Sequence, residues 1–296
     1  MLGAHRRAQP RPPARPRQPR YPQARPVTRQ DFGLEQVLRE LGRRGGGGFE
    51  WYKDSCLLRR IEVRMRARGV GTLAGYAELL AADHDEMDRL LRTLSVRVTS
   101  FFRNPDTWQR LLALLAQDGA GREGRLTAWS MGCATGEEAW SLAMLLLEHA
   151  GRSGCLPPEG IEVFASDVDA PALETARAAR YPAHALEAIH KVLDRPYGAV
   201  REGSFEVESS VRPRVVFHRE DLTAAAPQPG RYDLVCCRNL LIFLGPEGQR
   251  RVLDAALGGL RAGGLLVLGR TESLIAMPDP HPVPVDVTHR IYRRAR

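Results

Sequence analysis

The stretch Trp129-Ser-Met-Gly-Cys-Ala-Thr-Gly-Glu-Glu138 decides the fold, because it has the pattern of a buried strand, a glycine loop and the start of a helix. Further along, a second short apolar run, Val163-Phe-Ala165, ends at Asp167. A glycine loop lets the backbone approach a ligand, and an acid at the tip of the next strand accepts hydrogen bonds from ribose hydroxyls. Together these features predict a site for a cofactor that carries adenosine.

The loop also narrows the kind of cofactor. Gly132 and Gly136 give the spacing G-x-x-x-G, which is neither the G-x-G-x-x-G of dinucleotide enzymes nor a P-loop with its lysine. Glu137 and Glu138 follow, and two carboxylates here repel a pyrophosphate but suit a cofactor with an ammonium group. This favours S-adenosylmethionine. The alternative is that both glutamates only complement the helix dipole.

Strands and helices alternate from residue 126 onward, which predicts an α/β fold with a parallel sheet covered by helices on both faces. A less regular stretch covers residues 181–213. The expected strands are 126–131, 161–166, 214–217, 232–237 and 264–269, the expected helices are 137–149, 170–179 and 246–261, and Val287–Arg293 is a candidate antiparallel strand at the end of the sheet.

Residues 31–118 are predicted to be helical. The first helix begins near Asp31 and carries an apolar stripe, and Gly45 to Gly48 end it. Further helices are expected at about 49–68, 73–82 and 86–94, and after Pro105. A glycine-rich, polar segment follows, so we expect a helical domain at 31–118, a linker at 119–125 and a cofactor-binding domain at 126–296.

The net charge of +8 is located in the first 30 residues, which hold eight arginines and no acids. The rest of the chain has as many basic as acidic residues, 35 of each. The Arg/Pro-rich tail, residues 1–30, has almost no large aliphatic residues, so we expect it to be disordered. It is either a solubilising extension or an electrostatic tether to something acidic.

The cysteines and the apolar runs indicate a cytoplasmic protein. The five cysteines are an odd number and include the adjacent pair Cys236 and Cys237, which argues against a disulfide framework. No Cys/His spacing predicts a zinc site. No apolar run reaches the roughly 18 residues of a membrane span, and the N-terminus has no apolar signal region.

Three further places carry candidate site residues. Asp167 ends a strand, and because Asp169 is better placed to cap the next helix, Asp167 is left for the ribose. Arg238-Asn239 ends the strand 232–237 at the sheet edge where such folds bind ligands, or else is a structural hydrogen-bonding pair. Arg103, four residues after Thr99, is suited to hold a carboxylate in fork geometry.

The chain resembles a known family, the CheR-type protein-glutamate O-methyltransferases that act on chemotaxis receptors. The resemblance covers residues 31–296, and the motifs occur in the family's order. The motifs that carry it are Tyr52-Lys53, Arg59-Arg60-Ile61, Arg64-Met65, Val98-Thr-Ser-Phe-Phe-Arg103, Ser130-Met-Gly-Cys-Ala-Thr-Gly-Glu-Glu138, Ala165-Ser-Asp-Val-Asp169, Cys237-Arg-Asn-Leu-Leu-Ile-Phe-Leu244 and Gly269-Arg-Thr-Glu-Ser-Leu274.

The resemblance implies a class I S-adenosylmethionine-dependent methyltransferase, a Rossmann-like doubly wound sheet preceded by a small all-helical domain. Thr99 and Arg103 match positions at the reaction centre, and Glu137 is favoured over Glu138 as the acid at the methionine end of the cofactor. The other implied cofactor contacts are Arg97, Gly132, Asp167, Asp221, Leu222, Arg238 and Asn239. Three positions depart from the pattern, because Arg97 and Asp221 stand where Asn occurs and Phe243 stands where many members have Tyr.

The implied activity is methyl transfer from S-adenosylmethionine to receptor glutamates, giving methyl esters and S-adenosylhomocysteine. A glutamate carboxylate is ionised at pH 7, so no general base is required. Arg60, Arg64 and Arg68 share one helix face and are expected to dock the acidic receptor helices, unless that face is only solvated. We expect a monomer that inserts into no membrane and binds no nucleic acid.

Two alternatives remain at this point. Phe243 favours a cofactor-binding scaffold or sensor that has lost turnover. The basic tail is the only sign of a methyltransferase that acts on nucleic acid, and Arg238-Asn-Leu-Leu is not the Asn/Asp-Pro-Pro-Tyr-like loop expected for a target amine.

Overall fold

The computed structural model describes residues 29–44, 48–94, 99–121, 123–225, 228–272 and 281–295. The predicted tail therefore lies outside the described residues, except for Arg29 and Gln30, which begin the first helix. Arg97 and the end of the motif at 269–274 also lie outside them. None of the helices in the described segments is long and apolar enough to cross a membrane.

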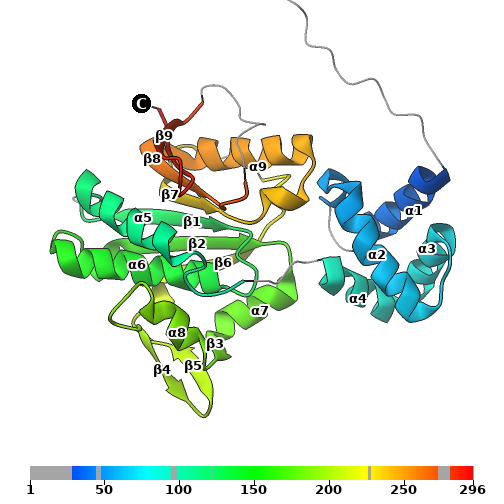
Figure 1. Cartoon of the computed structure of the whole chain (residues 1–296), viewed down its shortest axis with the longest axis horizontal. Coiled ribbons are helices and arrows are strands. Elements are labelled where there is room, and N and C mark those ends of the chain that lie inside the picture. Colours follow the sequence, from blue (N-terminus) through cyan, green and yellow to red (C-terminus); the bar gives the residue numbers. More distant parts are fainter. Residues whose placement is uncertain are drawn as a thin grey trace, which may run out of the picture.

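The N-terminal part consists of helices packed around one apolar cluster (Figure 1). It contains α1 (Arg29–Arg44), the short 3-10 helix η1 (Phe49–Trp51), α2 (Asp54–Arg68), α3 (Leu73–Ala82) and α4 (His84–Leu94). Thr72 caps α3 by accepting a hydrogen bond from the Gly75 amide, and Gly69 ends α2 in the left-handed conformation. The predicted apolar stripe of α1 is buried at Leu34, Val37 and Leu41, whereas Phe32 is exposed.

Within the described residues the main sheet has seven strands in the order β6-β2-β1-β7-β8-β10-β9. The parallel strands are β1 (Leu126–Met131), β2 (Ile161–Asp167), β6 (Val215–Arg219), β7 (Tyr232–Cys237) and β8 (Leu260–Leu268). The order reverses between β1 and β7, as the predicted doubly wound fold requires.

The end of the chain differs from the single predicted strand. Residues 287–290 form a turn, which separates β9 (Val283–Asp286) from β10 (Ile291–Arg293). β10 pairs antiparallel with β8, and β9 pairs antiparallel with β10. The antiparallel addition at the end of the sheet was predicted, but its second strand was not.

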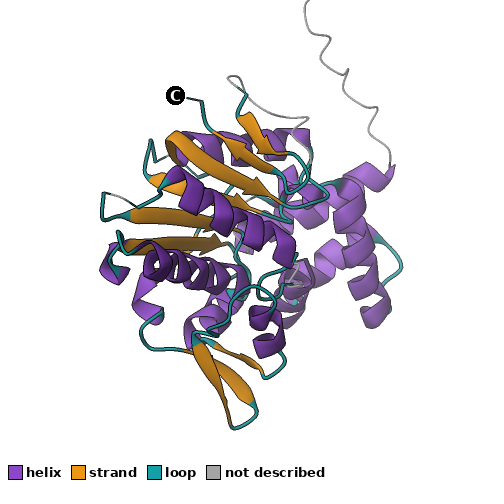
Figure 2. Cartoon of the chain, turned by 60° about the vertical axis from the view of Figure 1, so that its left-hand side comes forward, coloured by secondary structure: helices purple, strands orange, loops and turns teal. Residues whose placement is uncertain are grey.

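Helices cover both faces of the sheet (Figure 2). The core on one face contains α5 (Pro105–Asp118), α6 (Glu137–Ser153) and α7 (Ala170–Ala178), and the core on the other contains α9 (Pro246–Gly259). Successive β1 side chains alternate between them, since Ala128 faces the first core and Trp129 the second. Short 3-10 helices, η2 (Pro158–Gly160), η3 (Arg212–Arg214) and η4 (Leu241–Phe243), complete the connections.

Residues 181–213, which lacked a regular pattern, form a small unit beside α6 and α7. The described residues there contain an antiparallel sheet in the order β3-β5-β4, with β3 (Arg180–Pro182), β4 (Gly198–Arg201) and β5 (Ser204–Val207). The helix α8 (Ala185–His190) lies between β3 and β4 in the chain. Phe205 connects this unit to the core through an edge contact with Phe101, at 5.7 Å between ring centroids.

Helix α5 packs with the sheet, whereas the sequence grouped it with the N-terminal helices. Its buried residues Trp108, Leu111 and Leu115 belong to the same apolar cluster as β1 and α6. The cluster of α1 to α4 contains no residue of α5 among those described. We therefore propose that the second domain begins before Thr99, and that residues 119–125 are a loop inside it.

Candidate active site

Two adjoining pockets lie at the carboxyl ends of β1, β2 and β7. The first is lined by the sheet side and by the helical part, which contributes Gly48, Phe49, Tyr52 and Leu94. The second is lined by Thr99, Arg103, Glu138 and Arg238, among others. Gly132, Ala134, Asn239 and Phe243 line both pockets, so a single elongated ligand can occupy the two together.

The glycine loop after β1 lines both pockets through Gly132 and Ala134. The amides of Gly132 and Cys133 both donate to the Ser166 carbonyl, at 2.8 and 3.0 Å, which ties the loop to β2. Gly132 and Gly136 have φ angles of 70° and 95°, in the region that favours glycine. A Cβ at Gly136 would lie 2.7 Å from the Ala176 Cβ, so a side chain there would push the loop away from α7.

Asp167 ends β2 in the first pocket, as predicted. Its Oδ2 accepts from the Ala134 amide at 2.8 Å, and its Oδ1 accepts from the Asp169 amide at 2.9 Å. Asp169 caps α7 through the Ala172 amide, which confirms the predicted cap, and the ribose role of Asp167 stays a prediction. Because a carboxylate has about four acceptor positions, Asp167 keeps capacity for the two ribose hydroxyls. Burial raises the pKa of Asp167.

Asp221 and Leu222 also line the first pocket. The Asp221 Oδ1 accepts from the amide and hydroxyl of Thr223, at 2.9 and 2.6 Å. Gly48, with a φ of 100°, approaches so closely that a Cβ there would lie 2.7 Å from the Asp221 Oδ2. The helical part thus closes the pocket by a backbone contact that only glycine allows.

Tyr52 lines the first pocket, but no role in the site was predicted for it from the sequence. The chain around it pairs with the segment after β7, since the Lys53 amide donates to the Phe243 carbonyl at 2.9 Å and the Gly245 amide to the Trp51 carbonyl at 2.7 Å. Burial raises the pKa of Tyr52 to about 12, with a further contribution from Asp167 and Asp221. The Tyr52-Lys53 motif was the available signal, but only folding brings it beside the segment that follows β7.

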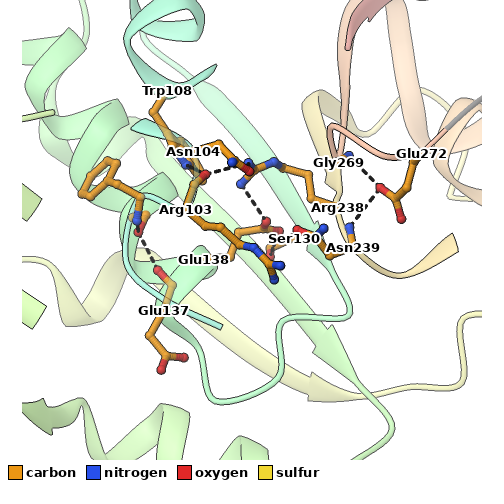
Figure 3. A network of polar contacts seen from close by, with 12 residues as sticks. Arg103, Asn104, Trp108, Ser130, Glu137, Glu138, Arg238, Asn239, Gly269 and Glu272 are labelled. Atoms are coloured by element: carbon orange, nitrogen blue, oxygen red, sulfur yellow. Dashed lines mark hydrogen bonds and ion pairs between the residues drawn. The ribbon is translucent and has the colours of Figure 1, made fainter. Parts of the chain in front are cut away.

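The second pocket is built on Arg238, whose side chain is 2% exposed. Its Nη2 donates to the Arg103 carbonyl at 2.7 Å, its Nη1 lies 3.4 Å from a Glu138 oxygen, and its guanidinium stacks 5.1 Å from the Trp108 ring (Figure 3). The predicted residue is therefore placed in the site, where its visible role is to hold the Arg103 backbone. The Trp108 indole donates to the same carbonyl at 3.0 Å.

The two glutamates after the glycine loop have different surroundings. Glu138 lines the second pocket and accepts from the Ser130 hydroxyl at 2.9 Å. Glu137 accepts from the hydroxyls of Thr135, at 2.7 Å, and Thr99, and its carboxylate points away from the Arg238 network (Figure 3). Burial raises the pKa of both. The choice of Glu137 for the methionine end stays a prediction, supported by its contact with Thr99.

The basic face of α2 is largely used inside the protein, which revises the predicted docking surface. Arg64 forms a two-pronged pair with the buried Glu86, at 2.9 and 2.6 Å, and Arg68 pairs with Asp83 at 2.9 Å. Arg60 donates to the Leu94 carbonyl and lies 5.3 Å from the centroid of the Phe243 ring. Regular spacing puts these arginines on one face, where Arg60 and Arg64 contact Phe243 and α4 and the Arg68–Asp83 pair remains at the surface.

The charges of the site favour a cationic ligand. Glu138, Asp167 and Asp221 line the two pockets together with Arg103 and Arg238, and Glu137 lies beside them. Glu138 and Arg238 neutralise each other, which leaves more carboxylates than guanidinium groups. The residues present therefore fit a cofactor with an adenosine group and positive charges at the other end.

Two protein-family models match this chain, and the description of one of them names the cofactor that the site fits. A family model described as "CheR methyltransferase, all-alpha domain" matches residues 33–95, and one described as "CheR methyltransferase, SAM binding domain" matches residues 97–285. The two matches meet just before Thr99, where the packing of α5 also divides the chain.

Three relatives illustrate the likeness. "Chemotaxis protein methyltransferase 2" of Pseudomonas aeruginosa is 30% identical over 84% of this chain and 88% of its own length. "Chemotaxis protein methyltransferase" of Listeria monocytogenes is 27% identical over 86% of this chain and 89% of its own. An uncharacterized 104.1 kDa protein of Rhodobacter capsulatus is 36% identical over 89% of this chain, which spans 28% of that protein. The chain belongs to the CheR methyltransferase family, with its α/β S-adenosylmethionine-binding fold and its all-helical N-terminal domain.

Proposed function

We propose that this protein transfers a methyl group from S-adenosylmethionine to glutamate side chains of chemoreceptors, forming glutamate methyl esters. The chemotaxis methyltransferases among its relatives support the pathway. The observation that carries the choice of acceptor is Arg103, which lines the second pocket beside the cofactor pocket and whose backbone is held by the buried Arg238.

Each end of the paired pockets has residues suited to one part of the cofactor. Asp167 would accept from the ribose hydroxyls, and Asp221 with Leu222 would hold the adenine between polar and apolar contacts. Thr99 and Glu137 would meet the ammonium end. When bound, the cofactor supplies a methyl group on a positively charged sulfur.

The chain's own part in the reaction is to orient the acceptor and exclude water. Arg103 offers a planar fork of N–H donors that can hold one oxygen of a carboxylate while the other faces the pocket. Among the described residues that line the second pocket, none is a histidine or a lysine. A carboxylate acceptor needs no base at neutral pH, so positioning and partial desolvation are sufficient.

An acidic receptor helix requires a basic surface, and the contacts of α2 lead us to propose a different one from Arg60, Arg64 and Arg68. On α2, Arg59 and Arg66 are exposed, whereas Arg60 and Arg64 serve internal contacts. We place receptor docking on Arg59 and Arg66. We propose that the protein acts as a monomer in the cytoplasm, and its five free cysteines fit a reducing compartment.

The test is methyl transfer from tritiated S-adenosylmethionine to a purified cytoplasmic receptor fragment. We expect label on the fragment that mild alkali releases as methanol, because esters hydrolyse and methylated amines do not. Cofactor binding without transfer would favour the scaffold alternative, and alkali-stable label would show that the acceptor is not a carboxylate.

A further inference from the structure

Glu272 follows β8 and is buried, with 2% of its surface exposed. Its Oε2 accepts from the Asn239 amide at 2.9 Å and the Gly269 amide at 2.6 Å (Figure 3). Its Oε1 accepts from the Leu241 amide at 2.7 Å. Two of these amides belong to the turn that leaves β7. One carboxylate therefore joins the ends of two neighbouring strands just behind the cofactor site.

The turn after β7 has a conformation that needs such support. Asn239 has a φ of 60°, in the left-handed region that costs energy for a residue with a side chain. In this conformation Asn239 lines both pockets. The hydrogen bonds that the Asn239 and Leu241 amides donate to Glu272 hold the backbone on either side of Leu240, so they fix the direction of the Asn239 side chain.

The space beside the Glu272 carboxylate admits only a glycine at position 269. A Cβ at Gly269 would lie 2.7 Å from the Glu272 Oε2 and 2.9 Å from the Asn239 amide nitrogen. A side chain there would therefore displace the contact between Glu272 and the turn. The Gly269-Arg-Thr-Glu272 part of the motif thus has a physical reason, because its glycine and its glutamate serve the same contact.

Glu272 is not among the residues lining either pocket, and both its oxygens are bonded to backbone amides. We infer that Glu272 is a positioning residue of the cofactor site, which acts by holding the Arg238-Asn239 turn so that Asn239 faces the bound cofactor. The inference rests on the cofactor half of the proposed function and is independent of the acceptor. The Glu272 charge also helps to raise the pKa of the neighbouring Glu138, after the larger effect of burial.

The test is calorimetric titration of S-adenosylhomocysteine into the wild type, Glu272→Gln, Asn239→Ala and the double variant. Glutamine turns an N–H group toward the backbone amides, so the turn loses part of its support. We expect about tenfold weaker binding for Glu272→Gln, and a double variant that binds no more weakly than Asn239→Ala, because coupled residues are not additive. Additive losses, or wild-type affinity in Glu272→Gln, would overturn the inference.

Glu86→Gln is the matched control for a purely structural effect. Glu86 is also buried and accepts from Arg64 and Tyr76, at 2.6 to 2.9 Å, but it lies in the helical part and lines neither pocket. We expect it to lower the melting temperature and leave affinity unchanged in the folded protein. Equal loss of affinity in Glu86→Gln would contradict a specific role for Glu272. Should Glu272→Gln not fold, Glu272→Asp, which keeps the charge with a shorter reach, is measured with the same expectations.

A wild type that does not bind S-adenosylhomocysteine would contradict the cofactor assignment itself. If the wild type binds S-adenosylhomocysteine and Glu272→Gln binds it equally well, only the role of Glu272 is contradicted.

Discussion

Arg103 lies outside the helices and strands, and hydrogen bonds to its backbone hold it in place. Its neighbours Phe102 and Asn104 have φ angles of 47° and 61°, and its carbonyl accepts from both Arg238 and Trp108. Strained backbone persists where surrounding contacts fix it, and such places are frequent at functional sites. The buried Arg238 thus prepares the position of a second arginine that faces the pocket.

Replacing Arg103 by lysine tests its proposed fork geometry. Lysine keeps the charge but not the planar pair of donors, so we expect turnover with the receptor fragment to fall about tenfold or more. Affinity for S-adenosylhomocysteine should change less than turnover. Arg125→Lys is the control, because Arg125 is exposed and pairs with Glu162 at the other end of the sheet. Unchanged kcat in Arg103→Lys would show that Arg103 does not orient the acceptor.

Local patterns predicted some residue roles and missed others for a definite reason. The Asp169 cap and the place of Asp167 at the end of β2 follow from neighbouring residues in the chain. Gly48 and Glu272 act through contacts with Asp221 and Asn239, which are distant in sequence. A local sequence pattern does not contain the distant residue that each of them contacts. The role of Glu272 in its motif therefore could not be predicted from the sequence.

Helix α2 shows the same limit for a whole face. The spacing of Arg60, Arg64 and Arg68 predicted a shared side of the helix, but the approach of α4 engages Arg64 in an ion pair with the buried Glu86, while Arg68 pairs with Asp83 at the surface. The side chain of Arg64 is 18% exposed and that of Glu86 is 0% exposed. Hydrogen bonds from Arg64 and Tyr76 outweigh the opposing effect of burial and lower the pKa of Glu86.

Removal of Arg64 should therefore act on stability and not on docking. Arg64→Ala leaves a buried carboxylate without its charge partner, so we expect the free energy of unfolding to fall by about 3 kcal/mol. Arg66→Ala should change it by less than about 0.5 kcal/mol and should weaken receptor binding. Urea denaturation and binding to the receptor fragment separate the two effects. Equal stability of both variants would contradict the internal role of Arg64.

The loop before η1 can be tested at Gly48. A side chain at a φ of 100° is strained, and its Cβ would meet Asp221, so Gly48→Ala should lose about 1 to 2 kcal/mol of stability and also weaken cofactor binding. Gly69→Ala is matched, since its φ is 67° but a Cβ there meets nothing within 4 Å. It should lose stability alone. Denaturation and titration with S-adenosylhomocysteine measure the two quantities, and equal binding in both variants would contradict closure by Gly48.

Strongly apolar strands and capped helices were predicted well, whereas short polar strands were not. β1 and β7 have the predicted bounds, because they are mostly apolar and buried along nearly their whole length inside the sheet. The strands β3, β4 and β5 are only three or four residues long and gain stability from pairing with each other. Helix α5 was assigned correctly as a helix, but its periodicity does not say which neighbour covers its apolar side.

The assembled protein gathers its site from both parts of the chain, and most of the gathered charges are carboxylates. Burial raises the pKa of Glu137, Glu138 and Asp167 above the ordinary value of about 4. A cationic cofactor stabilises the ionised forms, so binding should release protons, and affinity should fall as the pH decreases through these raised values. For folding alone the sign is opposite, since a raised carboxyl pKa favours the folded state at low pH and that contribution is lost as the pH rises.

Titration of S-adenosylmethionine at pH 7 and pH 5, in two buffers with different ionisation enthalpies, measures this linkage. We expect weaker binding at pH 5 and net proton release on binding, with a smaller pH effect for S-adenosylhomocysteine, which lacks the sulfonium charge. Proton uptake, or affinity independent of pH, would show that these carboxylates do not balance the charge of the cofactor.

The most direct test of carboxyl methylation at this site is tandem mass spectrometry of a chemoreceptor fragment after incubation with the protein and S-adenosylmethionine. Under the proposed function we expect one added methyl group on glutamate side chains, absent when Arg103→Ala replaces the wild type. A methyl group on lysine, arginine or another nitrogen, or equal glutamate methylation by Arg103→Ala, would contradict the account.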